Sequence, residues 1–175
     1  MRNFTLIITF NFLSSLTLAQ NAPEVVDEIL DYWQQTKQNL KELRRVDEET
    51  YEFSTDGGEI IKFYDGEQLV RLSLHLKGET GLLNRSYCLK DGKLVYVFNE
   101  EFRYNVPYYI DSVKAKSMGF NEWFDPEKTQ LFMSQFYFQE GELIWWVEDE
   151  QPISKDHPDF KKKEMLFMDE LVELK

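Results

Sequence analysis

The sequence predicts an α+β fold: a single antiparallel meander sheet of about six or seven strands, packed on a long N-terminal helix, with a further helix at the C-terminus. Two observations carry this prediction. Apolar residues recur at a spacing of three and four near both ends of the chain, as in amphipathic helices. Between them, short runs of alternating apolar and polar residues are separated by glycine-containing turns, as in antiparallel hairpins.

The first twenty residues have the composition of a secretory signal peptide. Arg2 supplies a positive charge, residues 4–19 carry no charge and are mostly apolar, and small Ala19 precedes a polar stretch. We expect cleavage after Ala19 or Gln20, which leaves residues 21–175 as one α+β domain, periplasmic or secreted. The alternative is an uncleaved anchor, although a comfortable membrane span needs about 20 apolar residues.

Residues 21–45 show the clearest helical pattern. Asn21 and Glu24 have the spacing of a capping box, acidic residues follow at the start, and basic residues lie at the end, where they complement the helix dipole. The apolar residues expected on the buried face are Val26, Ile29, Leu30, Trp33, Leu40 and Leu43. We expect this face to pack on the sheet.

The alternating runs predict seven strands. Asp-Gly or Glu-Gly at 65–66, 91–92 and 140–141 supplies the positive φ that tight hairpin turns need. The unequal spacing of these glycines argues against a tandem-repeat fold, so the three stretches are better interpreted as one type of hairpin turn than as a repeated ligand site. The expected strands are Tyr51–Thr55, Glu59–Tyr64, Gln68–Leu76, Leu83–Lys90, Lys93–Glu101, Thr129–Phe138 and Glu142–Glu148.

Residues 102–128 interrupt the strand pattern. Pro107 and Pro126 disfavour a continuous element, and residues 111–118 predict a short helix that ends at Gly119. After the last strand, residues 160–174 predict a helix with four apolar residues on one face, although "EMLFM" within it also fits an edge strand. The four residues are Phe160, Phe167, Leu171 and Leu174.

The charge and cysteine content narrow the possible partners. The net charge of −12 disfavours binding to nucleic acid or to anionic membranes, because phosphates attract lysine and arginine. The single cysteine, Cys88, cannot form an intramolecular disulfide, so we expect it to pack as a small apolar residue inside its strand. No further segment is apolar enough to span a membrane.

The sequence carries weak catalytic signals. His75 and His157 are the only histidines and have no metal-ligand spacing, and no nucleophile motif is present. No phosphate loop, dinucleotide fingerprint or calcium loop appears either, so we expect neither a metal nor a cofactor. The clusters Glu100-Glu101 and Glu148–Glu150 keep a carboxylate-dependent hydrolase open as an alternative, since glycosidases use two facing carboxyls.

Aromatic residues in the irregular segment are the candidate binding residues. They either complete the core by folding over one end of the sheet or contact a protein or small ligand. We therefore expect an exported, non-catalytic binding or inhibitor-like module, with a hydrolase or a structural accessory protein of the cell envelope as the alternatives. The six candidates are Tyr104, Tyr108, Tyr109, Phe120, Trp123 and Phe124.

Overall fold

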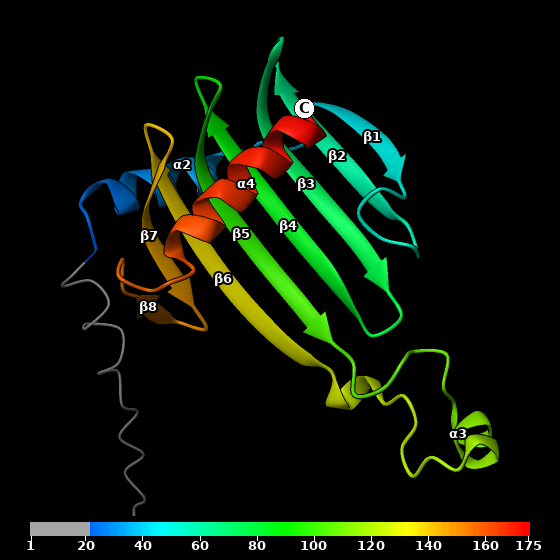
Figure 1. Cartoon of the computed structure of the whole chain (residues 1–175). Coiled ribbons are helices and arrows are strands. Elements are labelled where there is room, and N and C mark those ends of the chain that lie inside the picture. Colours follow the sequence, from blue (N-terminus) through cyan, green and yellow to red (C-terminus); the bar gives the residue numbers. More distant parts are fainter. Residues whose placement is uncertain (1–21) are drawn as a thin grey trace, which may run out of the picture.

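An eight-stranded antiparallel sheet with one helix on each face and a lobe at one end makes up the computed structural model of the chain (Figure 1). The structure describes residues 22–175; the expected signal peptide and the expected capping residue Asn21 lie outside them. The helices are α2 (Val25–Gln38), α3 (Ser112–Met118) and α4 (Phe160–Leu174), with a 3₁₀ turn η1 at Pro126–Lys128.

The strands follow one another in space in the order in which they follow in the sequence, which confirms the meander. Asp91 and Gly92 have φ values of 52° and 77°, and Glu140 and Gly141 have 51° and 88°. Positive φ at both positions is what type I′ hairpins require. The strands are β1 (Arg44–Thr50), β2 (Gly58–Asp65), β3 (Gln68–Gly78), β4 (Gly81–Lys90), β5 (Lys93–Arg103), β6 (Gln130–Gln139), β7 (Glu142–Glu148) and β8 (Gln151–Ile153).

Helix α4 covers one face of the sheet and builds the larger core. Phe167 lies 4.5 Å from Phe136 and 6.4 Å from Phe138, ring centre to ring centre, and all three side chains are buried. The helix forms as expected, and the four expected apolar residues are its buried ones. The edge-strand interpretation of "EMLFM" is therefore wrong.

An ion pair ties α4 to the strands beneath it. Glu170 of α4 pairs with Arg85 of β4 and accepts a hydrogen bond from the Tyr87 hydroxyl. Arg85 also donates from Nε to Asn99 Oδ1 at 3.0 Å, and only 11% of each charged side chain is exposed. Because both charges are largely removed from water, either one would destabilise the fold if its partner were missing.

Helix α2 covers the opposite face with a smaller cluster. Trp33 packs 5.0 Å from Tyr96, and the Arg71 guanidinium lies 3.9 Å above the Trp33 ring. Cys88 is fully buried in the same cluster, as expected. The adjacent Trp145 and Trp146 divide between the two faces, since Trp145 packs in the α2 cluster and Trp146 stacks on Phe136 in the α4 core.

Three of the expectations were wrong. Helix α2 is shorter than predicted and ends at Gln38, so Leu40 and Leu43 lie in the turn that follows it. Residues 44–50 form the edge strand β1, whereas the expected strand at Tyr51–Thr55 is a loop. The sheet has eight strands instead of six or seven, because the three-residue strand β8 was also missed.

Candidate functional site

Residues 104–129 form the lobe, which projects beyond the sheet from the end of β5 and returns at the start of β6 (Figure 1). Its first residues are fixed to the β3–β4 turn, since Tyr104 N donates to Thr80 O at 2.8 Å and Tyr108 N to Glu79 O at 2.9 Å. Asn105 clamps the base, donating to Trp123 O at 2.9 Å and accepting from Asp125 N at 3.1 Å. These bonds hold the lobe in one orientation.

Helix α3 forms at the tip of the lobe for local reasons. The Asp111 carboxylate accepts from Val113 N and Lys114 N, which caps the helix, and Gly119 ends it with a φ of 75°. This confirms the expected short helix. Ile110 and Ala115 are the buried residues of the lobe, at 3% and 1% exposure, and make a small core under α3.

The six candidate aromatic residues separate into two groups. Tyr104 and Phe124 are half-buried and pack against each other at 5.0 Å between ring centres, so they hold the lobe together. The other four are between 41% and 54% exposed, and none of the six belongs to either core cluster of the sheet. The exposed four are Tyr108, Tyr109, Phe120 and Trp123.

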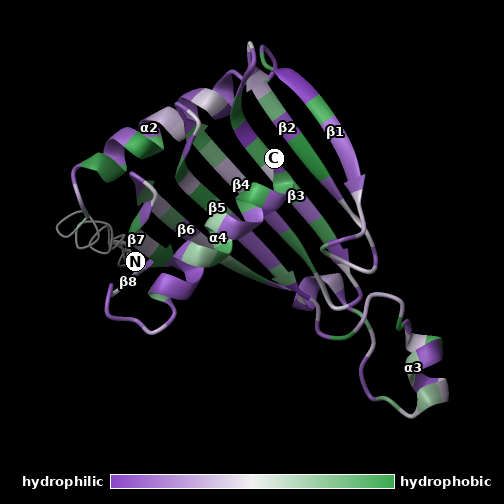
Figure 2. Ribbon diagram, turned by 45° about the horizontal axis from the view of Figure 1, so that its top comes forward, coloured by the Kyte–Doolittle hydropathy of each residue, from purple (hydrophilic) through white to green (hydrophobic). Residues whose placement is uncertain are grey.

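Two apolar side chains that the sequence analysis did not single out extend the same surface. Val113 is 76% exposed and Met118 is 52% exposed, and both belong to α3. Their exposure could have been predicted from the sequence. A seven-residue helix whose buried residue is Ala115 can bury little else, so the remaining apolar residues of "SVKAKSM" must face outward. Figure 2 shows that α3 stands clear of the sheet and carries both hydrophobic and hydrophilic residues.

Three of the four exposed rings, Tyr109, Phe120 and Trp123, border two open hollows on the lobe. One hollow of about 890 Å³ is lined by Tyr104, Tyr109 and Phe120 among others, and a second of about 780 Å³ is lined by Val113, Phe120 and Trp123 among others. Phe120 contributes to both. The surface therefore has two concave parts with the Phe120 ring between them. This shape suits contact with another molecule.

The charges on the lobe differ from those on the rest of the chain. Lys114 lies 4.5 Å above the Tyr109 ring, and Lys116 has no carboxylate partner within residues 22–175. The Asp111 carboxylate is occupied by the helix cap, and Glu122 pairs with Lys128 at 2.6 Å, which lowers the pKa of Glu122. Helix α3 thus carries two lysines and no carboxylate in a protein of net charge −12, whereas the lobe as a whole carries four carboxylates and three lysines.

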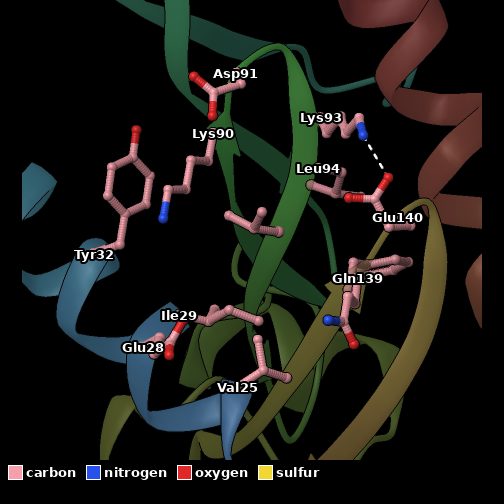
Figure 3. Close-up of a pocket in the computed structure, with 12 residues that line it drawn as sticks. Val25, Glu28, Ile29, Tyr32, Lys90, Asp91, Lys93, Leu94, Gln139 and Glu140 are labelled. Carbon is pink, nitrogen blue, oxygen red and sulfur yellow. Dashed lines mark hydrogen bonds and ion pairs between the residues drawn. The ribbon is translucent and has the colours of Figure 1, made fainter.

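A cleft of about 290 Å³ lies between α2 and the ends of the β4–β5 and β6–β7 hairpins (Figure 3). Val25, Ile29 and Leu94 are among its apolar lining residues, and Lys93 and Glu140 form an ion pair on one side. On the other side the Lys90 amine lies 5.4 Å from the centre of the Tyr32 ring, whose hydroxyl donates to Leu89 O. The lining contains no serine, cysteine or histidine, so it lacks the Ser–His or Cys–His pair of a hydrolase that uses such a nucleophile.

The acidic residues considered as catalytic candidates flank β6 and are engaged in the fold. Glu100 of β5 is paired in register with Met133 of β6, whose backbone N–H donates to Asp149 Oδ1 in the β7–β8 turn at 2.9 Å. Glu101 pairs with Arg103 at 2.6 Å.

The carboxyl groups whose pKa departs from the ordinary value are all shifted downward. Hydrogen bonds from lysines lower the pKa of Glu122 and Asp159. At Glu164 burial raises the pKa, but the hydrogen bonds from Lys161 and from the Leu143 backbone together outweigh it. A general acid of a glycosidase needs the opposite shift.

The histidines and the cysteine are likewise engaged in the fold. His75 Nδ1 and Asn84 Oδ1 lie 2.8 Å apart, and the His157 ring packs edge-on against Trp146 at 5.3 Å. Burial raises the pKa of Cys88 to about 11, so its thiol stays protonated at neutral pH. Within residues 22–175, no group of three His, Cys, Asp or Glu side chains is placed to hold a metal ion.

Comparison of the chain with protein-family models, with curated proteins and with solved structures found no match. None of the helices in residues 22–175 is both long and apolar enough to cross a membrane.

Proposed function

We propose that this chain is an exported, non-catalytic binding protein that contacts a partner protein through the lobe. The observation that carries the proposal is the exposure of four aromatic rings on a lobe whose backbone is fixed at its base and capped at its tip. Exposed aromatic rings on an ordered scaffold lose little conformational entropy on binding and are enriched at the centres of protein interfaces.

The charges on the lobe indicate the chemistry of the partner. Lys114 and Lys116 lie on the same short helix as the exposed Val113 and Met118. A partner that presents carboxylates around an apolar recess would match both features, because electrostatic complementarity speeds association and excludes partners of the wrong charge. We therefore propose an acidic, apolar protein surface as the counterpart of the lobe.

The sheet edges are less suited to bind a partner. Edge strand β1 has the sequence "RRVDEET", in which five of seven residues are charged, and edge strand β8 has three residues with Pro152 in the middle. Charged and proline-containing edges are what proteins use to prevent strand addition. The lobe is thus favoured over strand addition as the means of contact.

Capture from native secretome or envelope extract tests the proposal. The baits are the unmodified mature chain and a lobe variant with Phe120→Ala and Trp123→Ala. Both substituted residues are exposed, and their loss leaves the Tyr104–Phe124 packing intact. The matched control is Met165→Ala with Val172→Ala, two exposed apolar residues of α4. We expect the control to retain the partner and the lobe variant to lose it.

A photo-crosslinker placed at Trp123, compared with one at Val172, shows whether the captured protein touches the lobe. If the lobe variant captures the same proteins as the unmodified chain, or if the crosslink forms only at Val172, the proposal is wrong. Recovery of the crosslinked partner in the membrane fraction would identify an accessory role in the cell envelope.

Export is tested separately. Expression of the full chain in a host with a general secretion pathway, followed by N-terminal sequencing of the exported protein, should give a mature start at Gln20 or Asn21. Retention of Met1 in a cytoplasmic product would contradict export and would leave the proposed lobe contact to be judged by the capture experiment alone.

A further inference from the structure

A groove of about 530 Å³ runs along the α4 face of the sheet, beside the helix and near the base of the lobe. In Figure 1 the ends of β3, β4 and β5 that point toward the lobe extend beyond α4, and the groove lies over these ends. Its apolar lining includes Phe53 in the β1–β2 loop, Leu76 of β3 and Leu83 of β4, all of which are partly exposed. A ligand there would rest on the sheet and lean against α4.

Four cations and one carboxylate line this groove in a strongly acidic protein. The cations are Lys77, Arg85, Arg103 and Lys163, and the carboxylate, Glu101, is paired with Arg103. Lys163 has no carboxylate partner within residues 22–175, and its amine lies 5.9 Å from the Trp146 ring centre. A concave surface with an excess of one sign of charge attracts ligands of the opposite sign.

Arg85 supplies the groove with a hydrogen-bond donor whose position is fixed by other side chains. Its Nε donates to Asn99 and its Nη1 pairs with Glu170, while its guanidinium lies 5.1 Å from the Phe167 ring centre. The side chain is 11% exposed, and Nη2 makes no hydrogen bond to any other residue that the structure describes. A guanidinium fixed on two sides keeps its remaining N–H groups available to a planar or tetrahedral anion at little entropic cost.

We propose that the groove binds a small organic anion, a carboxylate or phosphate attached to an apolar body. The anionic group would lie between Arg85 and Lys163, and the apolar body would lie over Phe53, Leu76 and Leu83. This site lies on the body of the protein and uses none of the exposed lobe rings, so it does not depend on the proposed lobe contact.

Calorimetry on the mature chain with four probes tests the ligand class. The probes are phenyl phosphate, 3-phenylpropionate, inorganic phosphate and the uncharged 3-phenylpropanol. We expect the two aromatic anions to bind and the alcohol to bind at least about tenfold more weakly, because only the anions can pair with the cations. The ratio between the phosphate and the carboxylate distinguishes the two kinds of head group, and weaker binding of inorganic phosphate measures the contribution of the apolar wall.

Variants locate the site. Lys163→Gln removes one groove cation and keeps most of the side chain, and Lys37→Gln, on α2 at the opposite face, makes the same change of net charge as a control. We expect Lys163→Gln to weaken binding of phenyl phosphate about tenfold and Lys37→Gln to leave it unchanged. Thermal unfolding of both variants checks that the fold is retained.

Nuclear magnetic resonance of the labelled chain gives a readout that needs no variant. Phenyl phosphate should shift the Arg85 Nε–H signal and the backbone amides of Leu76 and Leu83. Absence of binding by both aromatic anions, equal losses for Lys163→Gln and Lys37→Gln, or signal changes confined to residues outside the groove would each overturn the proposal.

Discussion

The aromatic residues of the α4 core and those of the lobe have similar side chains but opposite environments. Phe136, Phe138 and Phe167 are at most 1% exposed, whereas Phe120 and Trp123 are 52% and 51% exposed. In the core each ring is surrounded by strand and helix side chains, and in the lobe a seven-residue helix has too small a surface to cover them. The comparison teaches that aromatic content alone does not distinguish a core from a binding surface; the size of the covering element does.

Removing a core ring should have the largest effect. Phe167→Ala deletes the ring that contacts Phe136, Phe138 and Tyr87, and we expect it to lower the free energy of unfolding by about 3–5 kcal/mol. Urea denaturation followed by tryptophan fluorescence measures this loss. A loss below about 1 kcal/mol would mean that α4 is not docked on the sheet as described.

Breaking the buried ion pair tests whether α4 is also held by charge. Glu170→Ala leaves the Arg85 guanidinium without its carboxylate, and we expect a cost of about 3 kcal/mol. The matched control is Glu173→Ala, an exposed residue on the same helix, which should change stability by less than about 0.5 kcal/mol. If the two variants lowered stability equally, the ion pair would not contribute to holding α4 on the sheet.

High pH should weaken the body of the protein. Burial raises the pKa of Cys88 to about 11 and of Tyr137 to about 12, and it also raises the pKa of Tyr87 and Tyr96. Since the folded state holds these protons more tightly, raising the pH above about 9 deprotonates the unfolded chain first and lowers the free energy of unfolding, by up to about 1.4 kcal/mol per pH unit for each group.

Denaturation midpoints from pH 7 to pH 11 measure this dependence. Cys88→Ala should flatten the first part of the decline, because the ordinary pKa of a thiol, 9.0, lies below the ordinary tyrosine pKa of 10.0, so the thiol of the unfolded chain deprotonates first. A midpoint that stays constant up to pH 11 would contradict burial of these groups.

Removing the cap of α3 should loosen the lobe and spare the sheet. Asp111→Ala deletes the acceptor for Val113 N and Lys114 N, and caps of this type are worth about 1 kcal/mol. We expect faster hydrogen exchange in residues 112–118 and unchanged exchange in β4 and β5. Asp111→Asn keeps an acceptor oxygen and serves as the control; increased exchange in β4 and β5 would show that the lobe and the sheet unfold together.

The smallest effect on stability is expected for an exposed ring. Phe120→Ala should change the free energy of unfolding by no more than about 0.5 kcal/mol, because its side chain is half in water in the folded state. Phe124→Ala, which removes the ring packed on Tyr104, is the comparison and should cost more. If Phe120→Ala destabilises as strongly as Phe124→Ala, the ring belongs to the core of the lobe instead of its binding surface.

The parts of the fold that could be predicted from the sequence are those with a periodic apolar pattern. In α4 the buried residues Phe160, Phe167 and Leu171 follow the helical spacing, and the hairpins at Asp91-Gly92 and Glu140-Gly141 carry their own turn signal. Edge strand β1 was missed because it pairs with β2 through its backbone and buries only Thr50, so its charged sequence shows no alternation. The same charges made residues 39–45 look like the end of a helix.

The candidate surface could be predicted in part. Six aromatic residues in an irregular segment indicated the lobe, but not that Tyr104 and Phe124 would pack together while Phe120 and Trp123 stay exposed. That division depends on the clamp by Asn105, a contact between residues far apart in the segment. The groove beside α4 left no local pattern, since Arg85, Asn99 and Lys163 come together only when the helix docks on the sheet.

The pairing of β5 with β6 at the base of the lobe determines whether the chain can be shortened without losing the sheet. Arg103 and Gln130 are paired across β5 and β6, so the two strands are already adjacent where the lobe begins and ends. All other strand pairs are also neighbours in sequence, and the entropy of closing a loop grows only slowly with its length. The lobe is therefore a topological insertion: a two-residue Asn-Gly turn could join β5 to β6 in its place, and the shortened chain would retain every strand pairing of the sheet.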